Sequence, residues 1–474
     1  MYPAQTSLIP VQIALARFLE MNGWSGIFSN YPFWYLGTTP FRYLTGPILP
    51  ALLVSLHQLL PSLSLLAIFF WLFSIIWIIS GIGIYRLIKE LGAEKPILMA
   101  ILFVFGPIVP YLFRFSDGLY LLTFSVLPFV LTFYLKLLKS PKSLKLVILT
   151  IAGISLLILL DSLIIPTLIV GMVAILLATT NWEKIEQKLR LSFFIFLLAL
   201  VISSFWYGPS YWLMLFAGPS WAGKGLGSVI VLLGKLIPAA LAFIMAAFSV
   251  KIFRRRDTVR DFCFYWLTIF GLLTLMRFLS DPDFWLDWTA YGVELQLGIA
   301  MLLGLIISKI YNLKFYFLLF ILYFLVLSFT FNKYVLGTIQ KDITQTVEYK
   351  IGKELNQVVK SGERVFLSGT TVFWLNSLFD ITQVRGGVDQ VSVDPNWRQA
   401  AWEIREGQDP QKSLDWLRKL SISYLVVHTS KSAEYYHDFK YPEKFEKISA
   451  LQRIYEDKGD IIYQVLPNLQ SANR

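Results

Sequence analysis

Long apolar runs alternate with short charged breaks between residues 63 and 336. The runs lie near 63–85, 95–113, 118–135, 146–160, 163–180, 191–216, 229–250, 262–279, 290–308 and 315–336. A helix needs about 20 apolar residues to cross the ~30 Å hydrocarbon core of a bilayer, and spanning segments must satisfy their own backbone groups there. The pattern predicts an all-α polytopic bundle of about ten transmembrane helices. The short run 146–160 and the run 163–180 form either a tight hairpin that turns at Asp161 or a partly re-entrant pair.

The texture of the sequence changes after residue 337. Short β-type runs occur at 364–369 and 422–428, helical patterns at 397–406 and 411–420, and a hairpin pattern over 451–466. These predict a small soluble α/β domain. Before the spans, residues 9–21 have an amphipathic pattern. The predicted divisions are an amphipathic and aromatic segment (1–62), the transmembrane bundle (63–336) and the α/β domain (337–474).

Basic residues mark alternate loops between the predicted spans. Because Lys and Arg in short loops stay on the cytoplasmic side, these loops are predicted to be cytoplasmic; their basic residues are Arg86, Lys89, Lys95, Lys136, Lys139, Lys142, Lys145, Lys184, Lys188, Arg190, Lys251, Arg254, Arg255, Arg256, Arg260, Lys309 and Lys314. The chain is therefore predicted to be a multi-pass cell-membrane protein whose segments 1–62 and 337–474 are both extracytoplasmic. No start-transfer helix precedes residue 60, so either an upstream transmembrane helix is missing from this chain or the N-terminal segment follows the first span across.

Composition narrows the function classes. Hydrophobic residues make up 56% of the 474 residues and charged residues 15%, whereas soluble domains are about 25% charged. The net charge of +11 does not indicate nucleic-acid binding, because the basic residues lie between apolar spans. The single cysteine, Cys263, and three scattered histidines provide no metal-ligand pattern, so no metal and no cofactor are expected.

Carboxylates near the outer ends of the spans are the first candidates for chemistry. Asp117 follows Arg114 in Arg-Phe-Ser-Asp-Gly, at the mouth of a short outer loop. A charge this close to hydrocarbon is costly unless it is paired or functional, so Asp117 belongs either to a structural pair with Arg114 or to a site. Glu294 lies inside an apolar run and is expected to line a wet groove. The acids at 281–287 could share a divalent cation, although a solvated turn explains them better.

The most distinctive stretch is 31–50, which combines aromatic residues, glycine and proline just before a span. Trp34, Phe41 and Tyr43 offer stacking faces, and Arg42 supplies a cation. Aromatic faces beside an arginine suit a sugar or a lipid phosphate. Interfacial anchoring is the equally favoured alternative.

This stretch resembles a known family. Trp34-Tyr-Leu-Gly37-Thr-Thr-Pro40, with Tyr43 and Pro47, resembles the "W, then G-x-P, then Y-x-P-P" stretch in the first outer loop of GT-C-type membrane glycosyltransferases. More narrowly, it resembles the membrane proteins labelled 6-pyruvoyl-tetrahydropterin synthase-related, a name that implies no pterin chemistry. Similar further segments, which bring the likeness to nearly the whole chain, are 83–92, Pro107, 111–117, Arg385-Gly386-Gly387 and 417–427.

The resemblance implies a polyprenyl-phosphate sugar donor, an inverting transfer and a general base in the first outer loop. That acid would fall near Gln5, Thr6 and Ser7, where this sequence has no carboxylate. Either the base lies upstream, or Glu20, Asp117 or the acids at 281–287 replace it, or catalysis has been lost.

The leading hypothesis is therefore a metal-free glycosyltransferase that moves a sugar from a polyprenyl-phosphate donor to an extracytoplasmic acceptor. Asp117 is the predicted catalytic carboxylate, Arg114 and Arg42 are predicted phosphate contacts, and Trp34, Phe41 and Tyr43 are predicted to shape the groove. Glu294 is a further candidate for substrate binding. The alternative is a catalytically inactive membrane scaffold or binding protein of the same fold.

Overall fold

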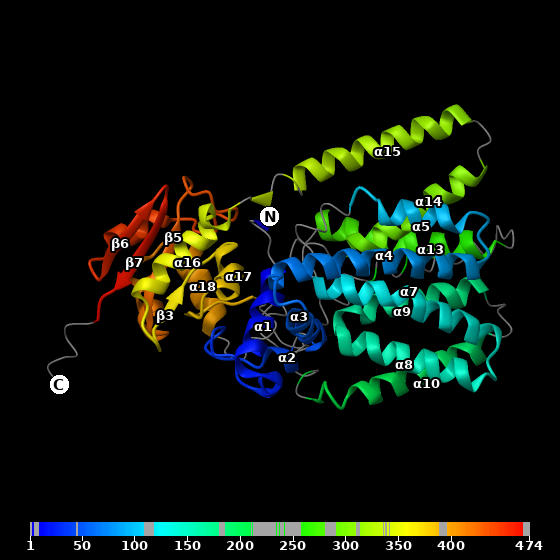
Figure 1. Cartoon of the computed structure of the whole chain (residues 1–474), viewed down its shortest axis with the longest axis horizontal. Coiled ribbons are helices and arrows are strands. Elements are labelled where there is room, and N and C mark those ends of the chain that lie inside the picture. Colours follow the sequence, from blue (N-terminus) through cyan, green and yellow to red (C-terminus); the bar gives the residue numbers. More distant parts are fainter. Residues whose placement is uncertain are drawn as a thin grey trace. The chain divides into compact units, whose positions relative to one another are not determined.

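A computed structural model shows the chain as two compact units (Figure 1). The structure describes residues 2–3, 9–43, 46–108, 118–179, 185–209, 211, 234, 237, 241, 257–279, 291–309, 313–334, 336, 339–340, 342–387 and 396–467. The first unit contains the described residues of Met1–Leu65 and of Thr338–Arg474. The second contains those of Leu66–Leu213 and Leu226–Gly337.

The second unit is a bundle of apolar helices, several of which run alongside one another (Figure 1). Five helical segments of the described chain are long and apolar enough to cross a membrane: Leu65–Leu91, Leu119–Lys139, Ser162–Thr179, Thr258–Leu275 and Gly292–Lys309. The helices are α4 (Leu65–Leu91), α5 (Pro96–Val104), α7 (Gly118–Lys139), α8 (Leu144–Leu160), α9 (Ile165–Thr179), α10 (Ile185–Ser203), α13 (Thr258–Leu279), α14 (Gly292–Lys309) and α15 (Leu313–Tyr334). The predicted multi-pass membrane class is confirmed. The count of ten crossings stays a prediction, because the span 229–250 lies almost entirely outside the described residues.

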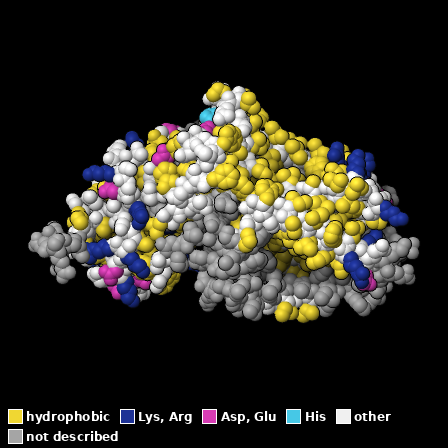
Figure 2. All heavy atoms as spheres, turned by 90° about the horizontal axis from the view of Figure 1, so that it is seen from below, with side chains coloured by type: hydrophobic (Ala, Val, Ile, Leu, Met, Phe, Trp, Pro, Cys, Tyr) yellow, Lys and Arg dark blue, Asp and Glu magenta, His cyan; other side chains and the backbone are white. Residues whose placement is uncertain are grey.

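Polar residues mark the ends of these helices. On the face in Figure 2, the Lys and Arg side chains of the helical unit gather at one end, and hydrophobic side chains cover most of the remaining described surface of that unit. Glu90, at the end of α4, accepts a bond of 2.8 Å from Lys139 at the end of α7 and lies 3.7 Å from Lys136. At the opposite end, α8 stops at Leu160 and Asp161 caps the short helix η2 (Ser162–Ile164) through Leu163 N at 2.9 Å. The chain thus breaks at Asp161, where the sequence predicts a turn.

The first unit contains a five-stranded mixed sheet with the order β4-β3-β5-β7-β6. Strand β3 pairs in parallel with β4 and β5, while β5, β7 and β6 pair antiparallel. The hairpin between β6 and β7 turns at Lys458 and Gly459, both with positive φ, as a two-residue type I′ turn requires. The bounds are β3 (Arg364–Phe366), β4 (Thr382–Gln383), β5 (Ile422–His428), β6 (Leu451–Asp457) and β7 (Asp460–Val465).

Helices cover this sheet and bury its apolar residues. Ile351 and Leu355 of α16 and Leu375 of α17 pack with Val365 and Val426 of the strands in one core cluster. The apolar residues of α16 recur every three or four positions, which is why one helix face can be buried. The predicted α/β fold of this segment is confirmed. Its helices are η5 (Ile343–Gln345), α16 (Val347–Val358), α17 (Thr371–Leu378), α18 (Asn396–Glu406), α19 (Pro410–Lys419) and η7 (Pro442–Lys447).

The N-terminal segment belongs to the same unit as the α/β fold. Its elements are β1 (Tyr2–Pro3), α1 (Ile9–Asn22), η1 (Trp24–Phe28), α2 (Pro40–Tyr43) and α3 (Ile48–Leu59), and β1 pairs antiparallel with β2 (Ile339–Gln340). The guanidinium of Arg17 donates to the carbonyl oxygen of Asn376 at 3.2 Å and lies 3.3 Å from the carboxylate of Asp380. A Cβ at Gly386 would come within 2.7 Å of Trp34 and Tyr35, so only glycine allows the two segments to pack this closely. The ends of the chain therefore fold as one body.

A partly buried carboxylate also ties the loop after β5 to the sheet. Asp438 accepts hydrogen bonds from the Ser368 hydroxyl, from Gly369 N at 3.3 Å and from Arg405 at 3.1 Å, and it lies 3.6 Å from Arg385. Burial acts to raise the pKa of Asp438, but the two guanidinium groups and the hydrogen bonds together hold it below its usual value of 3.8. Asp438 therefore stabilises the fold as an anion.

We expect Asp438→Asn to destabilise the protein by about 1–3 kcal/mol at neutral pH, because two arginines lose their counter-ion. A carboxyl group with a lowered folded-state pKa contributes its full stability above the pKa of the unfolded chain, and this contribution is lost as the pH falls through the folded-state pKa. The difference between wild type and variant should thus shrink as the pH drops below about 4. Thermal unfolding midpoints measured across this pH range test the expectation. Glu456→Gln, which removes the exposed pair with Arg453, is the control and should change little.

Candidate functional site

Three polar side chains meet inside the helical unit at the beginnings of three helices. Tyr120, Thr167 and Glu294 are each the third residue of their helix, in α7, α9 and α14 respectively. The Tyr120 hydroxyl and the Thr167 hydroxyl, the latter at 2.8 Å, donate to the same oxygen, Oε1, of Glu294. The hydroxyl oxygens of Tyr120 and Thr167 are 3.1 Å apart. Helix N-terminal ends favour negative charge, so this is a suitable place for a carboxylate.

The second carboxylate oxygen of Glu294, Oε2, can accept a further hydrogen bond. Glu294 is fully buried, and its Oε2 has no hydrogen-bond partner among the residues that the structure describes. A buried carboxylate oxygen is costly when it is unpaired. It can accept a hydrogen bond from a hydroxyl group, which is the commonest donor that a sugar presents.

Neighbouring residues hold Glu294 in place. The indole Nε1 of Trp266 donates to the Glu294 carbonyl oxygen at 2.8 Å. The side-chain amide of Gln296 donates to the carbonyl oxygens of Leu102 and Phe103 at 3.2 and 3.4 Å, which connects α14 to α5. The cluster is thus a packed feature of the bundle.

Of the predicted site residues, the structure describes the side chains of Trp34, Phe41 and Glu294. Asp117, Arg114 and the acids at 281–287 lie outside the described residues, as do the side chains of Arg42 and Tyr43. In the sequence, Asp117 directly precedes Gly118, the first residue of α7. Glu294 is described in the helical unit.

Trp34 and Phe41 belong to the core of the first unit. Both are buried, and Trp34 Nε1 donates to Asn376 Oδ1 at 2.9 Å. The ring of Trp34 also packs against Tyr31, with 4.6 Å between centroids. Glu20, another candidate to replace the missing base, is paired with His57 at 2.5 Å.

A second polar cluster, in the α/β fold, has the outline of a nucleophile, histidine and acid. Thr371 Oγ1 is 3.2 Å from His428 Nε2, and His428 Nδ1 is 2.7 Å from Asp460. Burial acts to lower the pKa of His428, but the hydrogen bond to Asp460 and the charges of Glu434, Asp460 and Asp438 raise it overall. Thr371 donates its single hydroxyl proton to Glu434 at 2.5 Å, so its oxygen can only accept from His428 Nε2 and offers the imidazole no proton to take. The geometry therefore indicates a structural network rather than a nucleophilic site.

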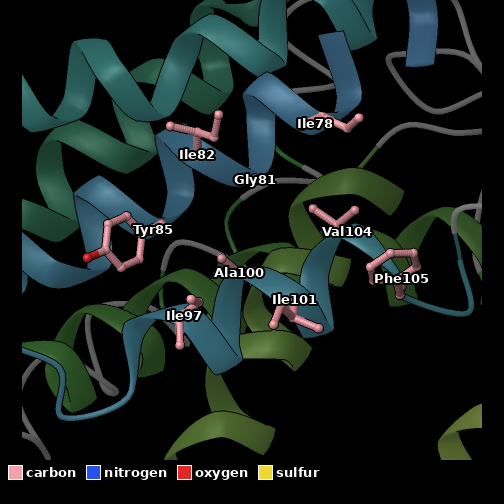
Figure 3. Close-up of a pocket in the computed structure, with 9 residues that line it drawn as sticks. All are labelled: Ile78, Gly81, Ile82, Tyr85, Ile97, Ala100, Ile101, Val104 and Phe105. Carbon is pink, nitrogen blue, oxygen red and sulfur yellow. The ribbon is translucent and has the colours of Figure 1, made fainter. Parts of the chain in front are cut away.

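The helical unit also has an apolar groove, of about 430 Å³, between α4 and α5 (Figure 3). Side chains such as Ile78, Ile82, Ile101 and Phe105 line it, and the hydroxyl of Tyr85 is the only side-chain polar group among its lining residues. A groove of this composition suits hydrocarbon and offers no acid or base. Among the described residues, no group of three or more His, Cys, Asp or Glu side chains could hold a metal ion.

Glu294 is recognisable as a candidate from the sequence, but its two partners are not. Tyr120 and Thr167 lie in apolar runs where single hydroxyl groups are common, since these can bond to the backbone of their own helix. Their position near the start of an apolar run that follows a predicted outer loop was the only available signal.

Comparison with solved structures identifies proteins with a similar fold. No protein-family model matches the sequence, and no curated protein matches it. The arabinofuranosyltransferase AftD from Mycobacteria is 16% identical over 98% of this chain, with a TM-score of 0.53. The chain spans only 38% of the length of AftD.

Two structures of an oligosaccharyltransferase from Archaeoglobus fulgidus are also similar. AglB in complex with an inhibitory peptide and a dolichol-phosphate is 11% identical over 98% of this chain, with a TM-score of 0.51, and the chain spans 71% of its length. The complex with Zn and sulfate is 12% identical over 98% of the chain, with a TM-score of 0.55 and 70% of its length spanned. At these identities the likeness establishes the fold alone.

Proposed function

Because the chain has the fold of the GT-C membrane glycosyltransferases, we propose that it transfers a sugar from a polyprenyl-phosphate donor to an extracytoplasmic acceptor. The observation that carries the proposal is the likeness of 98% of the chain to membrane sugar transferases, one of them in complex with dolichol-phosphate. The narrower resemblance to the 6-pyruvoyl-tetrahydropterin synthase-related membrane proteins stays a prediction.

In this proposal Asp117 acts as the general base. It takes the proton of the acceptor hydroxyl as the oxygen attacks the anomeric carbon, and the lipid phosphate leaves from the opposite face, which inverts that carbon. Arg114 and Arg42 neutralise the charge that grows on the departing phosphate, since guanidinium groups match phosphate geometry. The position of Asp117 in the sequence supports this role, because Asp117 stands directly before α7, the helix that carries Tyr120.

The aromatic residues and Glu294 have supporting roles in the proposal. Trp34 and Phe41 are buried, so they would shape the predicted substrate groove indirectly, by fixing the backbone of the 31–50 segment. Tyr43 is proposed to contribute a contact face to this groove. Glu294 Oε2 accepts a hydrogen bond from a hydroxyl group of the substrate, while Tyr120 and Thr167 fix the other oxygen.

Reconstituted protein should transfer labelled sugar from polyprenyl-phosphate donors to an acceptor. A panel of donors with different sugars, each supplied in liposomes, makes the test independent of knowing the natural sugar. Transfer that depends on the protein supports the proposal. If no donor in the panel gives transfer or is bound, the catalytic proposal fails; if donors bind without transfer, the inactive binding protein is the better description.

Glu294→Gln separates a substrate contact from a structural role. Glutamine keeps the shape of the side chain, and its carbonyl oxygen can still accept from Tyr120 and Thr167, but its amide group replaces the open oxygen. Losing a hydrogen bond to a charged group costs about 1.5–3 kcal/mol, so we expect transfer to fall about 10- to 100-fold with an unchanged melting temperature. Glu90→Gln, at the other end of the bundle, is the control. Wild-type transfer by Glu294→Gln would remove Glu294 from the site.

A further inference from the structure

Five large apolar side chains of the first unit are exposed at the ends of neighbouring elements. Met21, at the end of α1, is 52% exposed, Trp24 and Phe28 of η1 are 49% and 67% exposed, and Leu59 and Leu60, at the end of α3, are 75% and 47% exposed. We call this set the apolar edge.

The members of the apolar edge belong to one local surface because their elements are tied together. Glu20 of α1 lies 2.5 Å from His57 of α3, so the two helices end beside each other. Helix η1 folds back on the end of α1, where Ser25 Oγ donates to the Asn22 carbonyl oxygen at 3.0 Å, and a Cβ on Gly26 would lie 3.3 Å from Leu19.

The apolar edge differs from the aromatic segment that follows it. Tyr31, Trp34, Tyr35 and Phe41 are all buried in the first unit, so their rings have almost no surface left for lipid. Interfacial anchoring, the alternative role predicted for the segment 31–50, therefore fits the apolar edge better.

Chain continuity identifies the occupant of this surface as lipid. Leu60 stands five residues before Leu65, where α4, the longest membrane-spanning candidate, begins. Five residues reach at most about 18 Å, so the end of α3 lies within that distance of the residue at which α4 begins. Trp, Phe and Leu beside polar groups are the composition of helices that lie in the membrane interface, and Glu20 and His57 provide the polar rim here.

We propose that the apolar edge inserts into the boundary between head groups and acyl chains of the bilayer. It anchors the first unit to the membrane surface at a second place besides the entry of α4. The inference holds whether or not the protein transfers sugar, because it rests on the exposed residues of the apolar edge and on the short connection to α4, not on the proposed site.

Spin labels placed on the edge test this proposal in the full-length protein. Phe28→Cys and Leu59→Cys are made in a Cys263→Ala background, which removes the native buried thiol, and each is labelled and placed in nanodiscs of phosphatidylcholine and phosphatidylglycerol. Trp402→Cys is the matched control, since Trp402 is an exposed aromatic residue of α18 with 53% exposure.

Collision rates with oxygen and with a water-soluble nickel chelate report the depth of each label. We expect the ratio of oxygen to nickel collision rates to be higher at positions 28 and 59 than at 402, and this excess to fall when the protein is moved from nanodiscs to lipid-free amphipol. Equal ratios at all three positions in nanodiscs would overturn the proposal. The melting temperature of each labelled variant is compared with that of the wild type, to show that the variant is folded.

Discussion

Asp117→Asn is expected to lower the rate of sugar transfer by about 10²- to 10⁴-fold, the usual contribution of a general base. Asparagine has nearly the size of aspartate, but its amide group cannot take up the acceptor proton. The attacking hydroxyl would then have to lose its proton to water, which raises the barrier for the step in which the new glycosidic bond forms. Donor binding should change little, because in our proposal the phosphate is held by Arg114 and Arg42.

Transfer measured in single-turnover experiments with saturating donor isolates this chemical step. Glu20→Gln is the informative companion, because Glu20 is another acid that could replace the base expected from the family resemblance, and it is already paired with His57. We expect Glu20→Gln to transfer at the wild-type rate. Equal activity in wild type and Asp117→Asn would exclude Asp117 as the base, and loss of activity in Glu20→Gln alone would assign the role to Glu20.

Local patterns in the sequence predicted the elements of the fold. The strand 422–428, the helices near 397–406 and 411–420, and the hairpin over 451–466 occur within a few residues of their predicted places. These elements have periods of 2 or 3.6 residues and turn residues such as Gly459, which are visible in a single sequence. The apolar runs likewise predicted the helices of the second unit, because a bilayer demands continuous apolar helices.

Pairing between distant segments could not be predicted in this way. Trp34 and Asn376 are separated by 342 positions, and nothing in either segment alone indicates the other. The aromatic stretch was therefore assigned to a groove or to the membrane interface, whereas four of its rings fill the core of the first unit. The partners of Glu294 were missed for the same reason, since two hydroxyl groups and a carboxylate on three separate helices come together only through tertiary packing.

Trp34→Ala is expected to destabilise the first unit by about 3–5 kcal/mol, as is usual when a buried tryptophan is truncated. The ring packs on Tyr31 and against the glycines at 386 and 387, so its loss leaves a cavity that cannot close without moving the backbone. The Oδ1 atom of Asn376 would also lose a donor, and keep only the bond from Gln383 at 2.7 Å.

Trp34→Phe separates these two costs. Phenylalanine fills much of the cavity but cannot donate to Asn376, so this variant should lose about 1–3 kcal/mol. Trp402→Ala removes an exposed ring and should stay within about 0.5 kcal/mol of the wild type. Melting temperatures in detergent, combined with limited proteolysis, distinguish the variants, because release of the N-terminal segment from α17 exposes it to protease. Suppose that Trp34→Ala had the wild-type melting temperature and that its N-terminal segment stayed protected from protease. Trp34 would then not be part of the core that joins the two ends of the chain. Stacking against the substrate would again be the better explanation for an aromatic residue at this position.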